Sequence, residues 1–298
     1  KLLRMIGAEV EFSDNKMTID TNGCDKPEAP YELVKTMRAS FYVLGPLMGR
    51  FGYAKVSLPG GCAWGPRPVD YHLKGLESLG ASIDLSQGDI IASGKLKGGT
   101  VVFEKSSVGA TGNILMAAVT ADGVTKIVNA SMEPEIVSLG HFLQKMGADI
   151  KGLGTTEIIV KGTKLTNNNI EFDIIPDRIE AGTFLISGLM TKGSISVNKI
   201  YYKDIEIVVD KLLEAGADIN SSGNQISISY NGMINPVDIT TSAHPGFPTD
   251  LQAQWMALMS ISNGDSVIKD NIYHIDRGYE NIESRYTSLG ADIVRISE

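Results

Sequence analysis

The chain has 298 residues, 43% of them hydrophobic and 21% charged, so it is long enough for two domains that each bury a core. Its formal net charge of −8 argues against general nucleic-acid binding, which relies on a basic surface. Two cysteines exclude a disulfide framework, and no Cys/His cluster indicates a zinc site. We therefore expect a cytoplasmic protein with no metal, no cofactor and no membrane segment.

The first predicted element is an amphipathic helix around Leu2, Leu3 and Ile6, followed by a Gly-Ala pair and a strand. This combination recurs five times. The recurring glycines are Gly7, Gly80, Gly147, Gly216 and Gly290, at spacings of 73, 67, 69 and 74 residues. Each glycine suits the left-handed position just after a helix, so the pattern predicts units of about 70 residues.

A second pattern has the same period and consists of small polar residues followed by a strongly apolar helix. These helices are expected to start near Arg38, Gly109, Glu180 and Asp250. Since they are apolar nearly all round, they should be buried as inner helices. The Gly-Ala helices, which have one polar face, should lie outside them. Short strands between them are predicted at Asp89, Thr100, Ile158 and Ile226. Clustered helix N-termini would suit phosphate groups, although small residues there also allow close helix packing.

The segment Ser57 to Asp70 (SLPGGCAWGPRPVD) has three glycines and three prolines in 14 residues, which predicts a loop. Cys62 in this loop has Arg67 nearby, and a cation can lower the pKa of a thiol. Two interpretations remain open from the residues alone: a reactive thiol, or a small buried hydrophobe. Cys24 lies in a turn-like stretch without a neighbouring arginine and is given no role.

Six ordered segments carry a resemblance to a known family: LPGGCAWGPRPVD, SVGAT, MEPEIV, IPDRIEAGTF, HPGFPTDLQAQ and IYHIDRGYE. In this order they resemble the enolpyruvyl transferases that act on UDP-N-acetylglucosamine, in the EPSP synthase-like superfamily. The resemblance implies an α/β fold of two domains, each an inside-out α/β barrel of three repeats. It implies a nucleotide-sugar-side domain at residues 1–175 and a catalytic-side domain at 176–298.

The resemblance also implies a reaction. The 3'-hydroxyl of UDP-N-acetylglucosamine would add to C2 of phosphoenolpyruvate while C3 is protonated, and phosphate would then leave, in the first committed step of peptidoglycan synthesis. Cys62 matches the proton donor that fosfomycin alkylates, and Asp250 matches the base that takes the hydroxyl proton. Arg67 and Arg277 match arginines that contact phosphoenolpyruvate. Asp250 could instead be an ordinary acidic residue at a helix start after Pro248.

The substrate-binding positions that the resemblance implies lie along most of the chain, with Asp177 and Arg178 at the match to the interdomain hinge. These positions are Arg38, Arg67, Pro68, Val69, Asp70, Tyr71, Lys105, Ser106, Ser107, Val108, Glu133, Asp177, Arg178 and Ile272. The expected partners are the two small-molecule substrates, with no nucleic acid and no membrane. Oligomeric state is not readable from the sequence.

The chain departs from the family pattern in two places. It starts after the family's N-terminal Lys-Asn pair, and SVIKDN runs straight into IYHIDRGYE, so most of one repeat is missing near Asn271. We therefore expect a longer intact polypeptide, with a break near Lys269 to Tyr273 and an unsupported barrel edge around Lys1. A truncated, non-catalytic nucleotide-sugar-binding paralogue remains an alternative, and 5-enolpyruvylshikimate-3-phosphate synthase is a more distant one.

Overall fold

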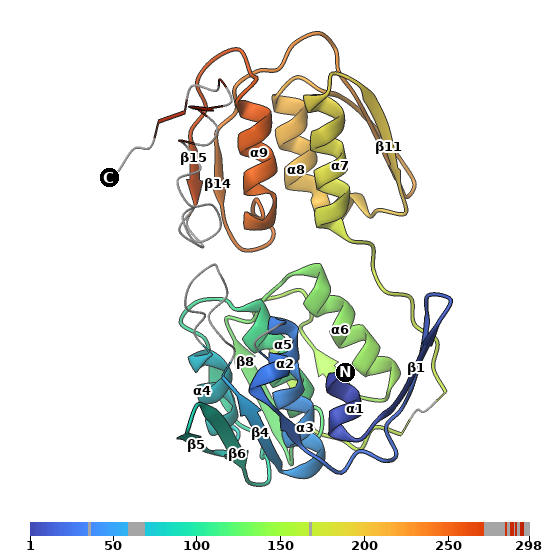
Figure 1. Cartoon of the computed structure of the whole chain (residues 1–298), viewed down its shortest axis with the longest axis vertical. Helices are drawn as coiled ribbons and strands as arrows, with labels where there is room; N and C mark the ends of the chain where they lie inside the picture. The colour runs from blue at the N-terminus through green and yellow to red at the C-terminus, as the bar shows by residue number, and fades with distance from the viewer. Residues whose placement is uncertain are drawn as a thin grey trace. The chain divides into compact units, whose positions relative to one another are not determined.

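The computed structural model describes residues 1–34, 37–58, 69–166 and 169–270, together with 284, 287, 288, 290, 293 and 294; the side chain of Arg38 is not described. The chain divides into two compact units, Lys1–Asp173 and Ile174–Glu298 (Figure 1). Both are α/β. No helix in the described ranges has the length and apolar character needed to cross a membrane.

In the first unit, helices alternate with short strands. The helical elements are α1 (Leu2–Ile6), α2 (Tyr31–Val34), the 3-10 turn η1 (Arg38–Val43), α3 (Leu44–Phe51), α4 (Asp70–Ser78), α5 (Val108–Ala118) and α6 (Pro134–Lys145). The strands are β1 (Glu9–Ser13), β2 (Lys16–Asp20), β3 (Glu28–Ala29), β4 (Tyr53–Ser57), β5 (Ser82–Ser86), β6 (Asp89–Ser93), β7 (Thr100–Val102), β8 (Val124–Val128), β9 (Asp149–Lys151) and β10 (Glu157–Lys161).

These strands form one two-stranded sheet, β1-β2, and two four-stranded sheets of order β3-β4-β6-β5 and β7-β8-β10-β9. The two larger sheets share one topology, in which a parallel pair (β3 with β4, β7 with β8) is extended by an antiparallel hairpin. The β1-β2 hairpin pairs Val10 with Ile19 and Phe12 with Met17, and Phe12 is 64% exposed.

The second unit contains α7 (Arg178–Met190), α8 (Tyr202–Glu214), the 3-10 turn η2 (Thr249–Leu251) and α9 (Gln252–Met259). Its strands are β11 (Ser194–Asn198), β12 (Asp218–Ser222), β13 (Gln225–Ser229), β14 (Ile239–Thr241) and β15 (Ile268–Asp270). They form a three-stranded antiparallel sheet, β11-β13-β12, and a parallel pair, β14-β15. Helix α7 contacts α8, α9 and β11, and Trp255 of α9 is fully buried.

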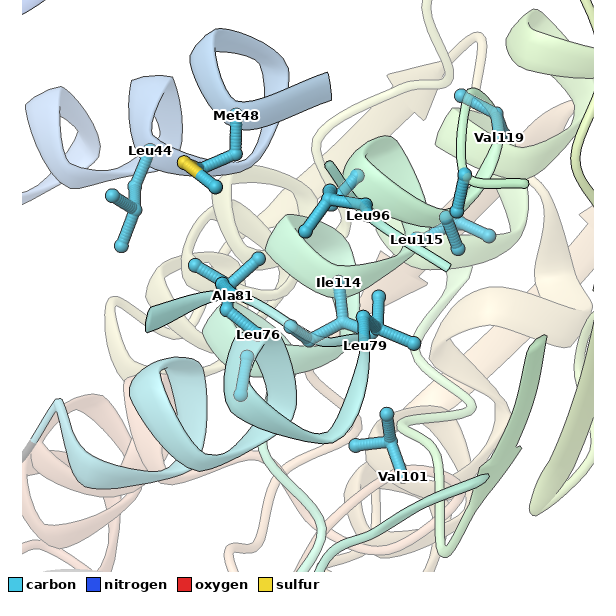
Figure 2. Close-up of a cluster of buried hydrophobic side chains, with 14 of the residues drawn as sticks. Leu44, Met48, Leu76, Leu79, Ala81, Leu96, Val101, Ile114, Leu115 and Val119 are labelled. Carbon is cyan, nitrogen blue, oxygen red and sulfur yellow. The ribbon is translucent and has the colours of Figure 1, made fainter. Parts of the chain in front are cut away.

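Helix α5 is the centre of the first unit. It contacts α3, α4, α6 and η1, and every residue from Ala110 to Leu115 is buried. Its Ile114 and Leu115 share one apolar cluster with Leu44 and Met48 of α3 and with Leu76 of α4 (Figure 2). An all-round apolar sequence is buried here because helices surround it on several sides.

Several sequence predictions are confirmed at the level of the backbone. All five recurring glycines have positive φ, from 89° at Gly80 to 104° at Gly7 and Gly147. Each of the four predicted strands is present, as β6, β7, β10 and β13. The β1-β2 hairpin is not among the sequence predictions, and its turn places Asp14 and Asn15 at φ 49° and 60°, the left-handed pair of a type I′ loop.

Two apolar helices start later than predicted. The segment from Arg38 forms a 3-10 turn, and the α-helix begins at Leu44. Pro46 explains this start, because it has no N–H to donate to a preceding helical turn but is tolerated in the first turn of a new helix. Likewise Asp250 lies in η2, and α9 begins at Gln252. Short 3-10 turns are common at helix N-termini.

Helices α3 and α5 approach each other closely at Gly45. The N–H of Gly45 donates to the side-chain oxygen Oδ1 of Asn113 at 2.6 Å, a buried bond. A Cβ at position 45 would overlap the backbone carbonyl oxygen of Asn113 and would lie 2.5 Å from its Oδ1. Only glycine therefore permits this distance between the two helices.

The end of β4, just before the segment that the sequence predicts to be a cysteine-containing loop, is fixed to β6. The Ser57 hydroxyl donates to one carboxylate oxygen of Asp89, and Lys55 Nζ lies 3.2 Å from the other. The hydrogen bond from Ser57 holds the pKa of Asp89 below its usual 3.8, with help from Lys55 and against partial burial. The N–H of Leu58 also donates to the carbonyl of Gly88 at 2.9 Å. These contacts hold the end of β4 firmly against β6 and the turn before it.

The first prediction concerns the Gly45 contact. Gly45→Ala forces α3 away from α5 and should lower the free energy of unfolding by about 3 kcal/mol, since overpacking a dense core typically costs about 1–3 kcal/mol. Urea denaturation monitored by circular dichroism measures this change. The control is Gly193→Ala, where a Cβ would have no neighbour closer than 3.6 Å. Equal stability of the two variants would contradict the close contact.

The second prediction concerns Asp89. A carboxyl whose pKa is lower in the folded state stabilises the fold above its unfolded pKa, and that stability is lost as the pH falls from about 3.9 through the lowered folded value. Ser57→Ala should therefore cost about 1 kcal/mol at neutral pH, and less at about pH 3. Denaturation at both pH values tests this. Asp84→Asn on the adjacent strand β5 is the control, and an equal pH effect there would refute the assignment.

Candidate functional site

In the first unit, the N-terminal ends of several helices carry the residues predicted to bind substrate. Arg38 is the first residue of η1, Asp70 is the first of α4, and Val108 is the first of α5. Glu133 is the N-cap residue of α6. The structure thus brings four separate predicted segments to helix starts around the central helix α5, which contacts η1, α4 and α6.

The start of α5 is capped by its own sequence. The Ser107 hydroxyl oxygen accepts the N–H of Ala110 at 3.3 Å, which satisfies one of the helix's unpaired donors. Lys105, Ser106 and Val108 are exposed next to this cap. A helix N-terminus beside a lysine provides N–H groups and positive charge, the two features that favour an anionic ligand.

The start of α4 lies against the segment of chain that precedes α5. The ring of Tyr71 packs on Phe103, with 5.9 Å between ring centroids, and Phe103 follows strand β7 just before Lys105. Asp70 is exposed and Val69 half-buried at the N-cap. The predicted residues Val69, Asp70 and Tyr71 are therefore neighbours of the Lys105–Val108 segment.

Glu133 is a buried carboxylate, with 8% of its surface exposed. The hydroxyl of Ser131 donates to Glu133 Oε2, and the N–H of Ser131 donates to Oγ1 of Thr111 at 3.0 Å. Thr111 lies in the first turns of α5, so Glu133 is held at the same end of that helix as Ser107. This short chain of contacts places a carboxylate beside the predicted anion site.

Sequence reasoning missed two polar residues in the middle of this region. His72, in the first turn of α4, is 5% exposed, and Asn113, inside apolar α5, is 1% exposed. His72 Nδ1 lies 3.0 Å from Asn113 Nδ2. The available signal was the asparagine itself, because a polar amide in an otherwise apolar helix is kept only where it finds hydrogen-bonding partners.

The second unit holds three more predicted residues. Asp177 caps α7 by accepting the N–H groups of Ile179 and Glu180 at 2.9 and 3.0 Å, and it lines a cavity of about 470 Å³ beside that helix. Arg178 is half-buried. Asp250 is exposed in the first turn of η2, two residues after Pro248. This is the place that the alternative, an acidic residue at a helix start, gives to it, and its role as the base stays a prediction.

Five predicted residues lie outside the described residues: Cys62, Arg67, Pro68, Ile272 and Arg277. The side chain of Arg38 lies outside them as well, and so do residues 271–273, where most of the expected break near Lys269 to Tyr273 falls. The roles assigned to these residues stay predictions. Cys24 is a half-buried free thiol. Within the described ranges, no three His, Cys, Asp or Glu side chains are grouped so that they could hold a metal ion.

Comparison with known proteins identifies relatives along most of the chain. A family model described as EPSP synthase (3-phosphoshikimate 1-carboxyvinyltransferase) matches residues 1–277. The UDP-N-acetylglucosamine 1-carboxyvinyltransferase of Chlorobium luteolum is 52% identical over 277 residues, covering 92% of this chain and 65% of the relative. The chain thus spans just under two thirds of that relative's length.

Two further comparisons extend this result. The enzyme of the same name from Chlorobaculum parvum is 42% identical, with 99% of this chain and 85% of the relative covered. That alignment runs over 363 positions against 298 residues, so at least 65 positions face a gap in this chain. The crystal structure of the enolpyruvyl transferase NikO from Streptomyces tendae superposes with a TM-score of 0.75 at 19% identity, covering 90% of this chain and 65% of that one.

The structural similarity to NikO shows the shared fold, while the sequence matches are far too extensive for a chance resemblance. The chain therefore belongs to the EPSP synthase family and, within it, to the UDP-N-acetylglucosamine 1-carboxyvinyltransferases.

Proposed function

We propose that the chain transfers the enolpyruvyl group of phosphoenolpyruvate to the 3'-hydroxyl of UDP-N-acetylglucosamine and releases phosphate, in peptidoglycan synthesis. The observation that carries the proposal is 52% identity to an enzyme named for this activity. The clustered helix N-termini of the first unit agree with it, because a nucleotide diphosphate needs N–H donors and a nearby cation.

Each reactive group has an assigned role in this proposal. The 3'-oxygen attacks C2 of phosphoenolpyruvate, Cys62 gives a proton to C3, and Asp250 takes the hydroxyl proton. Loss of phosphate from C2 and of a proton from C3 then restores the double bond. Arg67 and Arg277 hold the carboxylate and phosphate of phosphoenolpyruvate.

The proposal includes several finer assignments. Residues 1–175 form the nucleotide-sugar side and 176–298 the catalytic side, and both are inside-out barrels built from repeats of about 70 residues. The enzyme acts in the cytoplasm, contributes to cell shape and division through the cell wall, and is a target of fosfomycin. Its partners are its two small-molecule substrates.

A second candidate function is nucleotide-sugar binding without turnover. It is favoured by one observation, the alignment gap of at least 65 positions, which is close to one predicted repeat. Synthesis of 5-enolpyruvylshikimate-3-phosphate is the third candidate. An EPSP synthase structure from Acinetobacter baumannii shares 19% identity, far below the 52% of the nucleotide-sugar enzyme, so this candidate is the weakest.

The third prediction tests turnover. With both substrates present, phosphate should be released continuously, and with either substrate alone it should not. Fosfomycin should stop the release and add its mass to the peptide that contains Cys62, whereas Cys24 stays unmodified. Phosphate assay and peptide mass spectrometry measure these outcomes. Tight binding of the nucleotide sugar without phosphate release would replace the proposal with the binding protein.

The fourth prediction concerns Asp250. Asp250→Ala should reduce kcat by at least about 100-fold while the Kd for the nucleotide sugar stays within about tenfold, because a base acts in the chemical step. Stopped assays measure kcat, and calorimetry measures the Kd for the nucleotide sugar. Asp265→Ala, an exposed acid in the same unit, is the control. A lost binding signal with a collapsed melting temperature would show that Asp250 is structural.

A further inference from the structure

The side-chain amide of Asn113 has an orientation that backbone groups fix. Its Oδ1 accepts the N–H of Gly45 at 2.6 Å, and its Nδ2 donates to the carbonyl oxygen of Phe41 at 3.1 Å. A backbone N–H can only donate and a carbonyl can only accept, so the amide cannot be flipped. Both bonds are buried, where an unpaired amide would be costly.

This fixed orientation determines the proton position on His72. Asn113 Nδ2 has two hydrogens, one for Phe41 and one for His72 Nδ1 at 3.0 Å. A donor faces Nδ1, so Nδ1 must accept and carries no proton, and a neutral imidazole then has its proton on Nε2. The ring is further held edge-on against Phe41, with 4.9 Å between centroids.

The same contacts join the three helix starts of the predicted nucleotide-sugar site. Phe41 belongs to η1, which begins at Arg38; His72 belongs to α4; Asn113 belongs to α5. The Nε2 side of the His72 ring faces the first turn of α5, where a Cβ on Gly109 would lie 3.2 Å from Nε2. One buried group of bonds therefore sets how η1, α4 and the capped start of α5 lie relative to one another.

We propose that His72, held as its Nε2–H tautomer by Asn113, is a positioning residue for nucleotide-sugar binding. This inference rests on the proposed function and adds a residue that acts on the site through helix placement. If the bond to Nδ1 is lost, Asn113 keeps its bonds to η1 and α3, but this hydrogen bond no longer joins α4 to them. The cost should appear in ground-state affinity for the nucleotide sugar, because the three helix starts bind that substrate in both the ground and transition states.

The fifth prediction uses two substitutions of nearly equal shape in the full chain. His72→Asn retains an acceptor oxygen at the position of Nδ1, whereas His72→Leu has the same branching without any acceptor. His72→Leu should raise the KM for UDP-N-acetylglucosamine by at least about tenfold and leave kcat within about threefold. His72→Asn should stay within about threefold of the wild-type KM. Leu143→Ala, in the core of α6, controls for stability loss alone.

Equal KM values for the Asn and Leu variants would overturn the proposal, as would a KM rise in Leu143→Ala that matches the rise in His72→Leu. If the Leu variant does not fold, imidazole ¹⁵N NMR of the wild type still tests the proposal. A protonated Nε2 with a bare Nδ1 is expected, and a protonated Nδ1 would refute it. Wild-type protein that binds no UDP-N-acetylglucosamine would sink the proposed function instead. In that case amide hydrogen exchange still tests the positioning role of His72. Exchange at Gly109 and Ala110 should be faster in the Leu variant than in the Asn variant, and equal rates would contradict that role.

Discussion

The first unit depends on the close approach of α3 and α4 to the buried helix α5. Glycine makes this approach possible at Gly45 on α3 and at Gly75 on α4, where added Cβ atoms would meet Asn113 and Ile114. Such packing gives many dispersion contacts, and it also leaves no space for water around polar groups. An unpaired amide would be costly inside such packing, and Asn113 has two backbone partners as well as His72.

In these helices, the residues that stabilise the core are different from those predicted to bind substrate. Buried apolar residues of α3, α4 and α5 belong to the core, while exposed or half-buried polar residues such as Asp70 and Ser107 lie at the helix starts. Because the core fixes the helix bodies, the N–H groups at their ends are oriented before any ligand arrives. A binding site built on rigid helix ends loses little conformational entropy when it is filled.

Local signals account for what the sequence predicted well. Gly147 and Gly216 stop helices by a conformation that glycine alone adopts without strain, and the strands at Asp89 and Ile226 follow from β-branched alternation. The pairing of His72 with Asn113 could not be predicted, because 41 residues separate the two and only the packing of α4 on α5 joins them. The delayed start of α3 depends on Pro46, a local signal that outweighs the apolar pattern around it.

The β1-β2 hairpin has a consequence for how molecules of this protein meet. Val10, Phe12, Met17 and Ile19 lie on one face of the hairpin, and its acidic and basic residues lie on the other. In the described part of the chain β2 pairs with β1 alone, whereas β6, β10 and β13 each pair with two strands. An open edge beside an apolar face is a template for sheet extension between molecules. At high concentration, association should therefore begin at an open edge of this hairpin, at Glu9–Ser13 or Lys16–Asp20, and salt should promote it by screening the charged face.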